Sequence, residues 1–385
     1  MRTIIAVSDA FDDFPTDFFK GVSRFLRTRP NYSIRHCPQL EVDHKGQYAS
    51  CDGIIANLFR ASRIEALKSA RVPIVDLSGM LTEDPTIISV DSNADMMAQL
   101  AADRFLQRGF THFGFYGRAS HPLCDLLRKA FTSRIRESGF QCSVHTAIAL
   151  HSLSEEKQRA AQAKDNRRTL EWVASLPPRT AVFCLNDFRA RNLLSKCLKL
   201  GRAVPNDIAI LGTGNISSQC LCTVVPLSSI DCNWEGLGYA AMRILASAIE
   251  CPVKPKPRKT FLVPPGPIVE RESTAVYPVD PPWLADAMSL VDCNISRPIS
   301  TADLAAAAGV SQTTLSAEFH KQFKMTAGQY ILSAKMQRAK DLAAEGGHTV
   351  KEIAYAIGFS SASYFSRTYK DYFGHSPSLD GKKRL

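Results

Sequence analysis

The feature that most constrains this chain is a residue pattern that occurs twice in its last third. Each copy follows a short stretch that ends in glycine, Ala305 to Gly309 and then Ala354 to Gly358. The matched positions are Leu315-Ser316, Phe319, Phe323, Thr326 and Ala327 in the first copy and Phe365-Ser366, Tyr369, Phe373, Ser376 and Pro377 in the second. Two helical units, each with a glycine turn between two helices, are typical of paired helix-turn-helix modules, which place a helix in the DNA major groove.

Length and charge support this interpretation only weakly. A chain of 385 residues is too long for one ordinary core, so we expect two or three domains. Hydrophobic residues at 45% and charged residues at 22% are typical of a soluble globular protein. The net charge of +10 favours a polyanionic partner, but from Pro281 to the end there are 12 Lys and Arg against 9 Asp and Glu. The case for DNA binding therefore depends on the motif.

The cysteines and the apolar runs exclude several classes of protein. Eleven cysteines are scattered from Cys37 to Cys293 without CxxC or zinc spacing, so we expect ordinary thiols in a reducing compartment, no metal and no cofactor. The apolar run from Ile4 to Val7 is too short for a secretory signal, and no run approaches the ~20 residues of a membrane span. The sequence predicts a cytoplasmic protein with no membrane partner.

In the first two-thirds of the chain, short apolar runs alternate with amphipathic helical stretches. The expected strands are Thr3–Val7, Gly53–Ala56, Pro73–Asp76, Ile87–Val90, His112–Gly117, Ala181–Leu185 and Ile208–Gly212. The expected helices are Thr16–Arg27, Ala94–Arg108, Leu123–Ser138, Glu155–Ser175, Arg189–Leu200 and Trp234–Glu250. This alternation predicts an α/β fold of doubly wound parallel sheets in two lobes, with ligands bound at the carboxyl ends of the strands.

A proline-rich segment separates this part from the duplicated units. We expect a sensor over residues 1–276, a linker over 277–282 and a DNA-binding domain over 283–385. Residues Lys254 to Pro267 are interpreted as the last sensor strand and its approach. Asp280 is expected to cap a helix that starts at Pro281 and runs through Asp292.

The C-terminal domain is expected to be all-helical. Capping boxes at Ser300 and Thr349 open the first helix of each unit, and Gly309 and Gly358 end them. The expected second helices are Gln312–Phe323 and Ser361–Phe373, joined by a long helix from Ala327 to about Ala344. Apolar residues at helical spacing, among them Leu315 and Phe319 in the first unit and Tyr364, Phe365 and Tyr369 in the second, are expected to be buried.

Several local sequences of the N-terminal part resemble the sensor domains of LacI-type repressors, which share the periplasmic-binding-protein fold. They are Ile88 to Asn93, His112 to Gly117, Val182 to Asp187, Val204 to Gly212, Pro226 to Ile230, Leu262 to Pro265 and Val269 to Thr274. Their order, followed by a C-terminal module, is similar to that of the xylose-operon activators. This resemblance implies a sugar-sensing domain joined to an AraC-type DNA-binding module.

The sequence departs from that family at two sugar-binding positions. Leu127 stands where the family places an Arg, and Gly214 stands where it places an Asp. Because polyol recognition needs polar anchors, these changes put pentose binding in doubt. The remaining candidate ligand-binding residues are Asp13, Phe14, Arg118, Asn186 and Asp187. Asp187 can equally be a helix N-terminal residue stabilised by the helix dipole, and Asp13, Phe14 and Arg118 can be ordinary loop residues.

The run from Ile353 to Pro377 resembles the AraC-type signature at nearly every position. Alignment to that signature implies that seven residues face DNA bases: Thr313, Ser316 and Ala317 in the first unit, and Ala362, Ser363, Ser366 and Arg367 in the second. Arg367 alone among them can bind guanine O6 and N7 through two hydrogen bonds; a phosphate or glutamate partner is the alternative. The candidate phosphate contacts are Lys321, Lys324 and Lys370, although a solvated surface lysine is equally ordinary.

Together these patterns predict a ligand-responsive transcription factor that activates carbohydrate-utilisation genes, with no catalytic residues. The expected partners are double-stranded DNA, a small effector such as a sugar, RNA polymerase and a second copy of the chain. One alternative keeps DNA binding but makes the sensor a degenerate dimerisation domain. A second alternative is an enzyme fused to the DNA-binding module, but no GxSxG, HExxH, Walker A or GxGxxG motif occurs.

Overall fold

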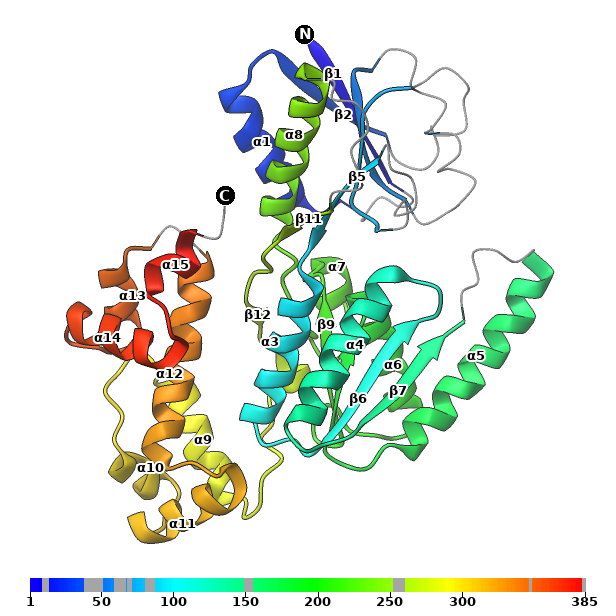
Figure 1. Ribbon diagram of the computed structural model, residues 1–385. Helices are drawn as coiled ribbons and strands as arrows, with labels where there is room; N and C mark the ends of the chain where they lie inside the picture. Colours follow the sequence, from blue (N-terminus) through cyan, green and yellow to red (C-terminus); the bar gives the residue numbers. More distant parts are fainter. Residues whose placement is uncertain are drawn as a thin grey trace.

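The structure, a computed structural model, consists of two α/β lobes and a helical domain beside them (Figure 1). It describes residues 1–8, 14–37, 51–58, 67, 71–79, 87–148, 155–251, 260–345 and 348–382. All seven expected strands and all six expected helices of the first two-thirds are present, each within two residues of its expected bounds. No helix within these described ranges is long and apolar enough to cross a membrane.

The first lobe, here called the N-lobe, contains one wholly parallel sheet in the order β11-β5-β4-β3-β1-β2. Its elements are β1 (Arg2–Ser8), α1 (Thr16–Thr28), β2 (Tyr32–Cys37), β3 (Gly53–Asn57), β4 (Ile74–Asp76), β5 (Ile87–Ser92), α8 (Trp234–Glu250) and β11 (Thr260–Val263). Helix α1 buries Phe18, Val22 and Phe25 at helical spacing against α8 and the sheet. The N-lobe is therefore closed by a helix that returns from late in the chain.

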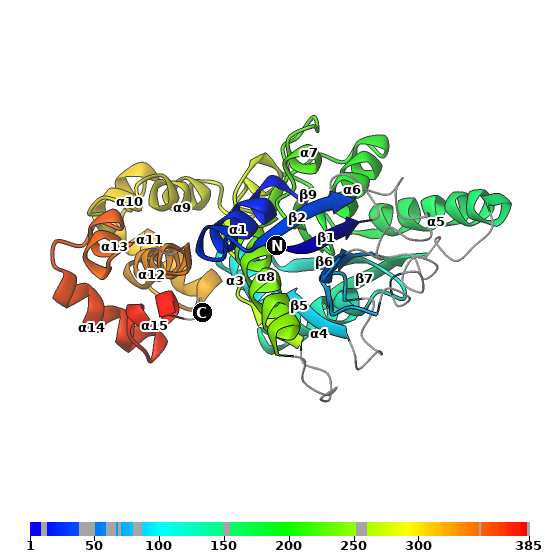
Figure 2. The same ribbon diagram turned by 90° about the horizontal axis from the view of Figure 1, so that it is seen from above.

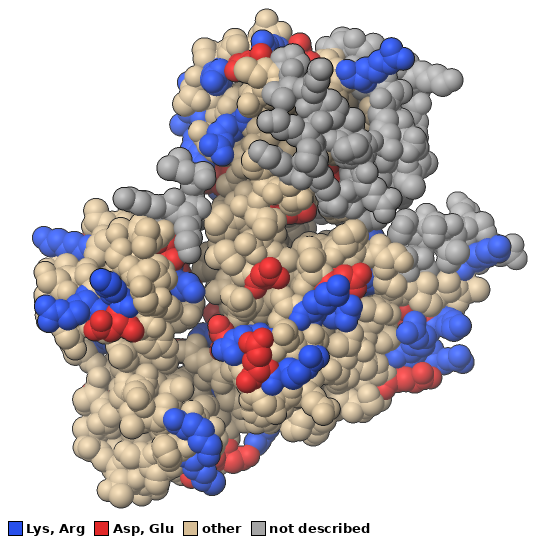
Figure 3. All heavy atoms as spheres, viewed as in Figure 1, with Lys and Arg blue, Asp and Glu red and all other residues tan. Residues whose placement is uncertain are grey.

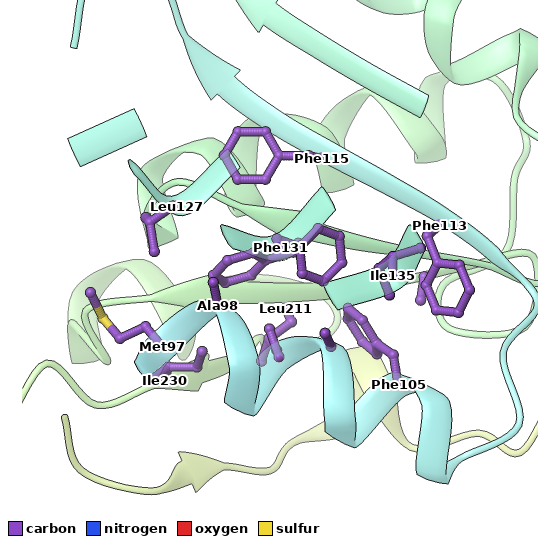
Figure 4. Close-up of a cluster of buried hydrophobic side chains, with 14 of the residues drawn as sticks. Met97, Ala98, Phe105, Phe113, Phe115, Leu127, Phe131, Ile135, Leu211 and Ile230 are labelled. Carbon is purple, nitrogen blue, oxygen red and sulfur yellow. The ribbon is translucent and has the colours of Figure 1, made fainter. Parts of the chain in front are cut away.

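The second lobe, the C-lobe, has a sheet in the order β12-β10-β9-β8-β6-β7, parallel except between β10 and β12. Its elements are α3 (Ala94–Gln107), β6 (His112–Arg118), α4 (Pro122–Glu137), β7 (Cys142–Ala147), α5 (Glu155–Ser175), β8 (Thr180–Cys184), α6 (Asp187–Lys199), β9 (Ile208–Thr213), α7 (Ser217–Cys220), β10 (Ser228–Ile230), β12 (Ile268–Val269) and the 3-10 turn η3 (Glu272–Thr274). Phenylalanines 105, 113, 115 and 131 fill the core between α3, α4 and the sheet (Figure 4).

The chain passes between the lobes three times, and backbone hydrogen bonds tie these crossings together. The Asn93 N–H donates to the Val263 carbonyl at 2.9 Å, and the Asp231 N–H donates to the Pro267 carbonyl at 3.0 Å. The Asn233 side chain donates to the Pro264 carbonyl at 3.0 Å. Three short crossing segments, hydrogen-bonded to one another, form a hinge between the lobes. This architecture allows two lobes to close around a ligand.

The C-terminal third is helical, as expected, and both views place it beside α3 of the C-lobe (Figures 1 and 2). Its helices are α9 (Trp283–Cys293), α10 (Thr301–Ala307), α11 (Gln312–Phe323), α12 (Ala327–Glu345), α13 (Val350–Ala356), α14 (Ala362–Phe373) and α15 (Pro377–Lys382). The expected bounds of α11 and α12 agree with the structure to within a residue.

The predicted start of α9 was wrong. Asp280 does not cap the helix, which begins at Trp283 and has no side-chain cap on its first turn. The Asp280 carboxylate instead forms an ion pair with Arg179 of the C-lobe, and its carbonyl accepts a hydrogen bond from Gln322 of α11. A tertiary partner thus outcompetes the local cap, so the segment between the domains is held at both sides.

Candidate DNA-binding surface and effector site

Each helix-turn-helix unit is built by the local chemistry that the sequence indicates. Ser300 and Asp303 form a reciprocal capping box at the start of α10, and Thr349 and Glu352 form one at the start of α13. The turns that follow these helices contain Gly309 at φ 64° and Gly358 at φ 76°, conformations that glycine adopts without strain. After these turns the chain enters α11 and α14, the two helices that carry the base-contact residues implied by the signature.

Helix α12 belongs to the cores of both units. Its first half packs Ala327, Tyr330 and Ile331 with α9, α10 and α11. Its second half packs Met336 and Ala339, together with Leu342, against α13 and α14. Helix α12 is therefore a shared spine that fixes the two units relative to each other.

A buried lysine stands where the two halves of α12 meet. The Lys335 side chain is 6% exposed, and its ammonium group donates to the Arg297 carbonyl and to the Ile357 carbonyl, both at 2.8 Å. Arg297 precedes α10, whereas Ile357 is the C-cap of α13, so one side chain connects the segment before the first unit to the turn within the second. Burial lowers the pKa of Lys335. No sequence pattern indicated this role, because a single lysine on a long helix is ordinarily solvated.

The residues assigned to base contacts lie on accessible faces of their helices. In α11 all three are exposed, and in α14 Ser363 and Arg367 are exposed whereas Ala362 and Ser366 are half-buried. The Ser366 hydroxyl donates to the Ala362 carbonyl at 2.8 Å, so its hydrogen is engaged within the helix. Arg367 therefore remains the base-contact candidate with the longest reach.

The candidate phosphate contacts differ in what they already bind. Lys321 forms an ion pair with Glu318 at 3.1 Å on α11. Lys324 adopts a left-handed conformation, φ 56°, at the C-cap of α11, where a glycine would be unstrained. Lys370 is exposed in the last turn of α14. In Figure 3, Lys and Arg side chains predominate over the second unit, while the surface of the first unit is mostly uncharged.

The expectation that Tyr364 is buried was wrong: it is 63% exposed on α14. Tyr364 precedes the buried Phe365 by one residue and is therefore turned about 100° away from the core stripe. It lies three residues before Arg367, on the same accessible side of the helix. Sequence reasoning missed it as a surface residue because two adjacent aromatics both suit a core.

In both lobes the parallel strands end on the side that faces the other lobe (Figure 1). The C-lobe brings together there the ends of β6 and β8, which carry Arg118 and Asn186. The Asn186 side chain caps α6 by accepting from the Arg189 N–H at 2.9 Å. Arg118 has a more unusual environment, because its Nε and Nη2 atoms are buried and make no hydrogen bond in the described part of the structure.

Asp187 holds the loop after β9. It is 1% exposed, and its carboxylate accepts from the Ser229 hydroxyl at 2.5 Å and the Ile216 N–H at 2.7 Å. Burial raises the pKa of this carboxyl to about 6 although these hydrogen bonds oppose the shift. Both oxygens are therefore engaged inside the C-lobe.

The two departures from the sugar-binding pattern have structural counterparts. Leu127 is fully buried in the C-lobe core, in the same cluster as Phe115 and Phe131 (Figure 4). Gly214 has φ 123°, and a side chain there would start 3.2 Å from the Asp187 carboxylate. Neither position carries a polar group toward a ligand.

Of the two N-terminal candidates, Phe14 is 4% exposed and packs against Phe18, with the two rings tilted and their centroids 4.5 Å apart. The structure thus places Phe14 in the aromatic core of the N-lobe. Asp13 lies outside the described residues.

A polar cluster joins the C-lobe to the helical domain. Arg104 of α3 contacts Glu270 at 2.7 Å and Asp292 of α9 at 3.3 Å, and the Tyr277 hydroxyl also donates to Asp292. Arg108 contacts Glu270 at 3.1 Å. Although burial opposes it, the two arginines hold the pKa of Glu270 below its ordinary value. The residues of this cluster connect the sensor to the helical domain, and its charged members line a groove of about 1200 Å³ between the two.

Comparison with known proteins agrees with this architecture. Residues 102–274 match the periplasmic binding protein-like domain family, and residues 304–380 match a helix-turn-helix domain family. The xylose operon regulatory protein of Escherichia coli K12 is 26% identical over 332 residues, which cover 85% of this chain and 82% of that protein. The HTH-type transcriptional regulator ArgR of Pseudomonas aeruginosa is 30% identical over 103 residues, 27% of this chain and 31% of that protein.

Among solved structures, a xylose-binding transcription activator has the same fold over the whole chain. It superposes with a TM-score of 0.58 at 22% identity and covers 99% of this chain and 97% of its own. The similarity thus includes both lobes and the helical domain in the same order.

Proposed function

We propose that this chain, an AraC-type transcriptional regulator whose sensor has the periplasmic-binding-protein fold, is a sugar-responsive transcription factor of the cytoplasm. The observation that carries the proposal is the shared spine: two capped helix-turn-helix units are fixed on α12 with their assigned base-contact faces accessible. Residues 1–276 act as the sensor and 283–385 as the DNA-binding domain, joined through 277–282.

Regulation follows from the contact between sensor and helices. An effector that closes the lobes changes the position of the C-lobe relative to the N-lobe. Because Arg104 and Asp292 link α3 to α9, this movement reaches the DNA-binding domain. The effector acts only through its different affinities for the states that bind DNA and those that do not.

The similarity to regulators of the xylose operon favours a carbohydrate effector and an activating role, with RNA polymerase and a second copy of the chain as partners. A sensor that serves only for dimerisation is not favoured, because 82% of such a regulator, including the sensor, aligns with this chain. An enzymatic role is likewise not favoured, since the relatives are named as regulators.

The proposal is tested by selecting DNA sites from a random pool with the full-length protein. Bound sites should share a sequence, and a sugar should change the affinity for that operator. We expect Arg367→Ala to cost about 1–3 kcal/mol and to relax specificity at one base position. Lys370→Ala, one turn farther along α14, should weaken all sites equally.

Fluorescence anisotropy on operators carrying each single-base change separates these results. If Arg367→Ala weakens every operator uniformly, Arg367 contacts phosphate and not a base. If selection returns no shared sequence, sequence-specific regulation is refuted.

A further inference from the structure

One feature of the sensor that its fold does not explain is the partly buried side chain of Arg118. Arg118 is the last residue of β6, an interior strand of the C-lobe sheet. It therefore lies at the end of that strand which faces the N-lobe. Its Nε and Nη2 atoms are shielded from solvent and have no hydrogen-bond partner in the described ranges. Nε–H and the Nη2 amino group lie on one edge of the guanidinium, the fork that binds a carboxylate or phosphate through two parallel hydrogen bonds.

The backbone fixes the place of this side chain. The Arg118 N–H donates to the Cys124 sulfur at 3.3 Å, which closes the turn between β6 and α4. Cys124 is itself buried in the C-lobe core. The guanidinium is therefore attached to a rigid part of the lobe and not to a mobile loop.

A second cation lies close by. Arg189, in the first turn of α6, has its guanidinium 5.8 Å from the centre of the Tyr116 ring. Burial, and then the charge of Arg189, lower the pKa of Arg118. No ion pair to either arginine is present among the described residues, and the acid nearest to Arg189 in the sequence, Asp187, is engaged with Ser229 and Ile216.

The same end of the sheet adds further positive potential, and two of its described positions, Leu127 and Gly214, carry no group that could bind a sugar hydroxyl. Helices α4 and α6 both begin there, directly after β6 and β8, and helix N-termini favour negative charge. The positions where related sensors hold sugar hydroxyls are Leu127, buried in the core, and Gly214. This end of the C-lobe sheet therefore combines two arginines with two helix N-termini, a combination that favours a negatively charged ligand group.

We propose that the effector is a polyhydroxylated anion, a sugar acid or a sugar phosphate, whose carboxylate or phosphate group is bound by the guanidinium fork of Arg118. Arg189 contributes to the attraction without a direct contact being required. The inference rests on the proposed function in one respect, that the sensor takes a carbohydrate effector. The inference goes beyond the proposed function because it specifies that this effector is negatively charged.

The test uses the full-length protein and matched sets of probes: D-glucose, D-gluconate and D-glucose 6-phosphate, and D-xylose, D-xylonate and D-xylose 5-phosphate. Binding is measured by thermal shift and by isothermal titration. We expect an anionic member to bind and the neutral parent of its set to bind at least about 10-fold more weakly. Comparison of the acid with the phosphate shows which anion the fork accepts. Affinity for the anion should fall as salt increases.

Arg118→Met should weaken binding of the anion by about 10- to 100-fold. Because Nε and Nη2 of Arg118 have no hydrogen-bond partner within the described part of the chain, the same variant should unfold at the same or a higher temperature than the wild type. Arg136→Met, which removes an exposed guanidinium from the far end of α4, is the matched control and should change neither property.

Three results would overturn the inference: a neutral sugar that binds as tightly as its anions, anion binding that Arg118→Met leaves unchanged, or no anion that binds. Thermal destabilisation of ligand-free Arg118→Met would also overturn it, since that residue would then be structural. Failure of the proposed function would give a result distinct from these. An effector would bind to the protein but leave its affinity for the selected operator unchanged.

Discussion

The buried lysine of the spine gives the most direct test of how the DNA-binding domain is assembled. Lys335→Met keeps the length and most of the volume of the side chain but removes the ammonium group. The Arg297 and Ile357 carbonyls then lose their donor. We expect the second helix-turn-helix unit to become less stable while the first keeps its core.

The size of the effect follows from the two contacts. Each hydrogen bond from a charged donor contributes about 1.5–3 kcal/mol, so both together contribute about 3–6 kcal/mol. The methionine variant buries no charge, and this offsets about a third of that loss, because apolar replacements of buried ions recover about 1–4 kcal/mol. The expected net cost is about 2–4 kcal/mol.

Hydrogen exchange followed by mass spectrometry measures this cost locally in the full-length protein. Amides of α13 and α14 should exchange about 30-fold faster or more in Lys335→Met, since 1.4 kcal/mol corresponds to a factor of ten. Amides of α3 and α4 in the C-lobe should be unchanged. Lys351→Met, which removes an exposed charge from α13, controls for the loss of one lysine.

If α13 and α14 exchange at the wild-type rate in Lys335→Met, the two carbonyl contacts contribute nothing. The two units would then be held by the apolar contacts of α12 alone, and the reasoning from Lys335 would be refuted.

Two further predictions concern the sensor and its contact with the helices. A double-mutant cycle with Arg104→Met and Asp292→Asn, measured by urea unfolding, should give an interaction free energy of about 0.5–3 kcal/mol, whereas zero would show that the domains do not dock through this pair. Burial raises the pKa of Asp187 to about 6 from an ordinary 3.8, so its contribution to stability is complete below pH about 4 and is lost as the pH rises through 6. The wild type should therefore lose about 3 kcal/mol relative to Asp187→Asn between pH 4 and 7, and a difference that does not vary with pH would contradict this.

The sequence predicted the central strands of both sheets and missed most of their edges. The unpredicted strands β2, β7 and β12 lie at the ends of the two sheet orders, and β10 has only three residues. Edge strands are covered on fewer sides, and β2 and β7 accordingly mix buried with exposed positions. A search for continuous apolar runs finds buried strands and overlooks such edges.

The helical domain was predictable because its signals are local. Caps, glycine turns and apolar spacing depend on residues within four or five positions of one another. The prediction for the start of α9 failed because the deciding contact is not local. Arg179, about 100 positions away in the sequence, binds the carboxylate of Asp280.

The sequence indicated where the candidate site residues lie along the strands and helices, but not which groups surround their side chains. Arg118 could be named from its place after a strand, but the burial of its Nε and Nη2 atoms depends on the packing of β6 against α4 and α6. Asp187 could be placed at a helix start, yet Ser229, which engages it, is 42 positions away. Contacts between residues so far apart in the sequence produce no local pattern by which they could be predicted.

The shared spine also sets a rule for the DNA that this protein can read. Because each half of α12 completes the core of one unit, the distance and rotation between α11 and α14 are fixed by the polypeptide. One base pair inserted between the two segments that these helices contact would rotate one segment by about 34° relative to the other. Operators should therefore tolerate no insertion within a half-site, while the spacing between half-sites depends on how two chains associate. Comparison of promoters bound by this regulator can thus separate the geometry of one chain from that of the dimer.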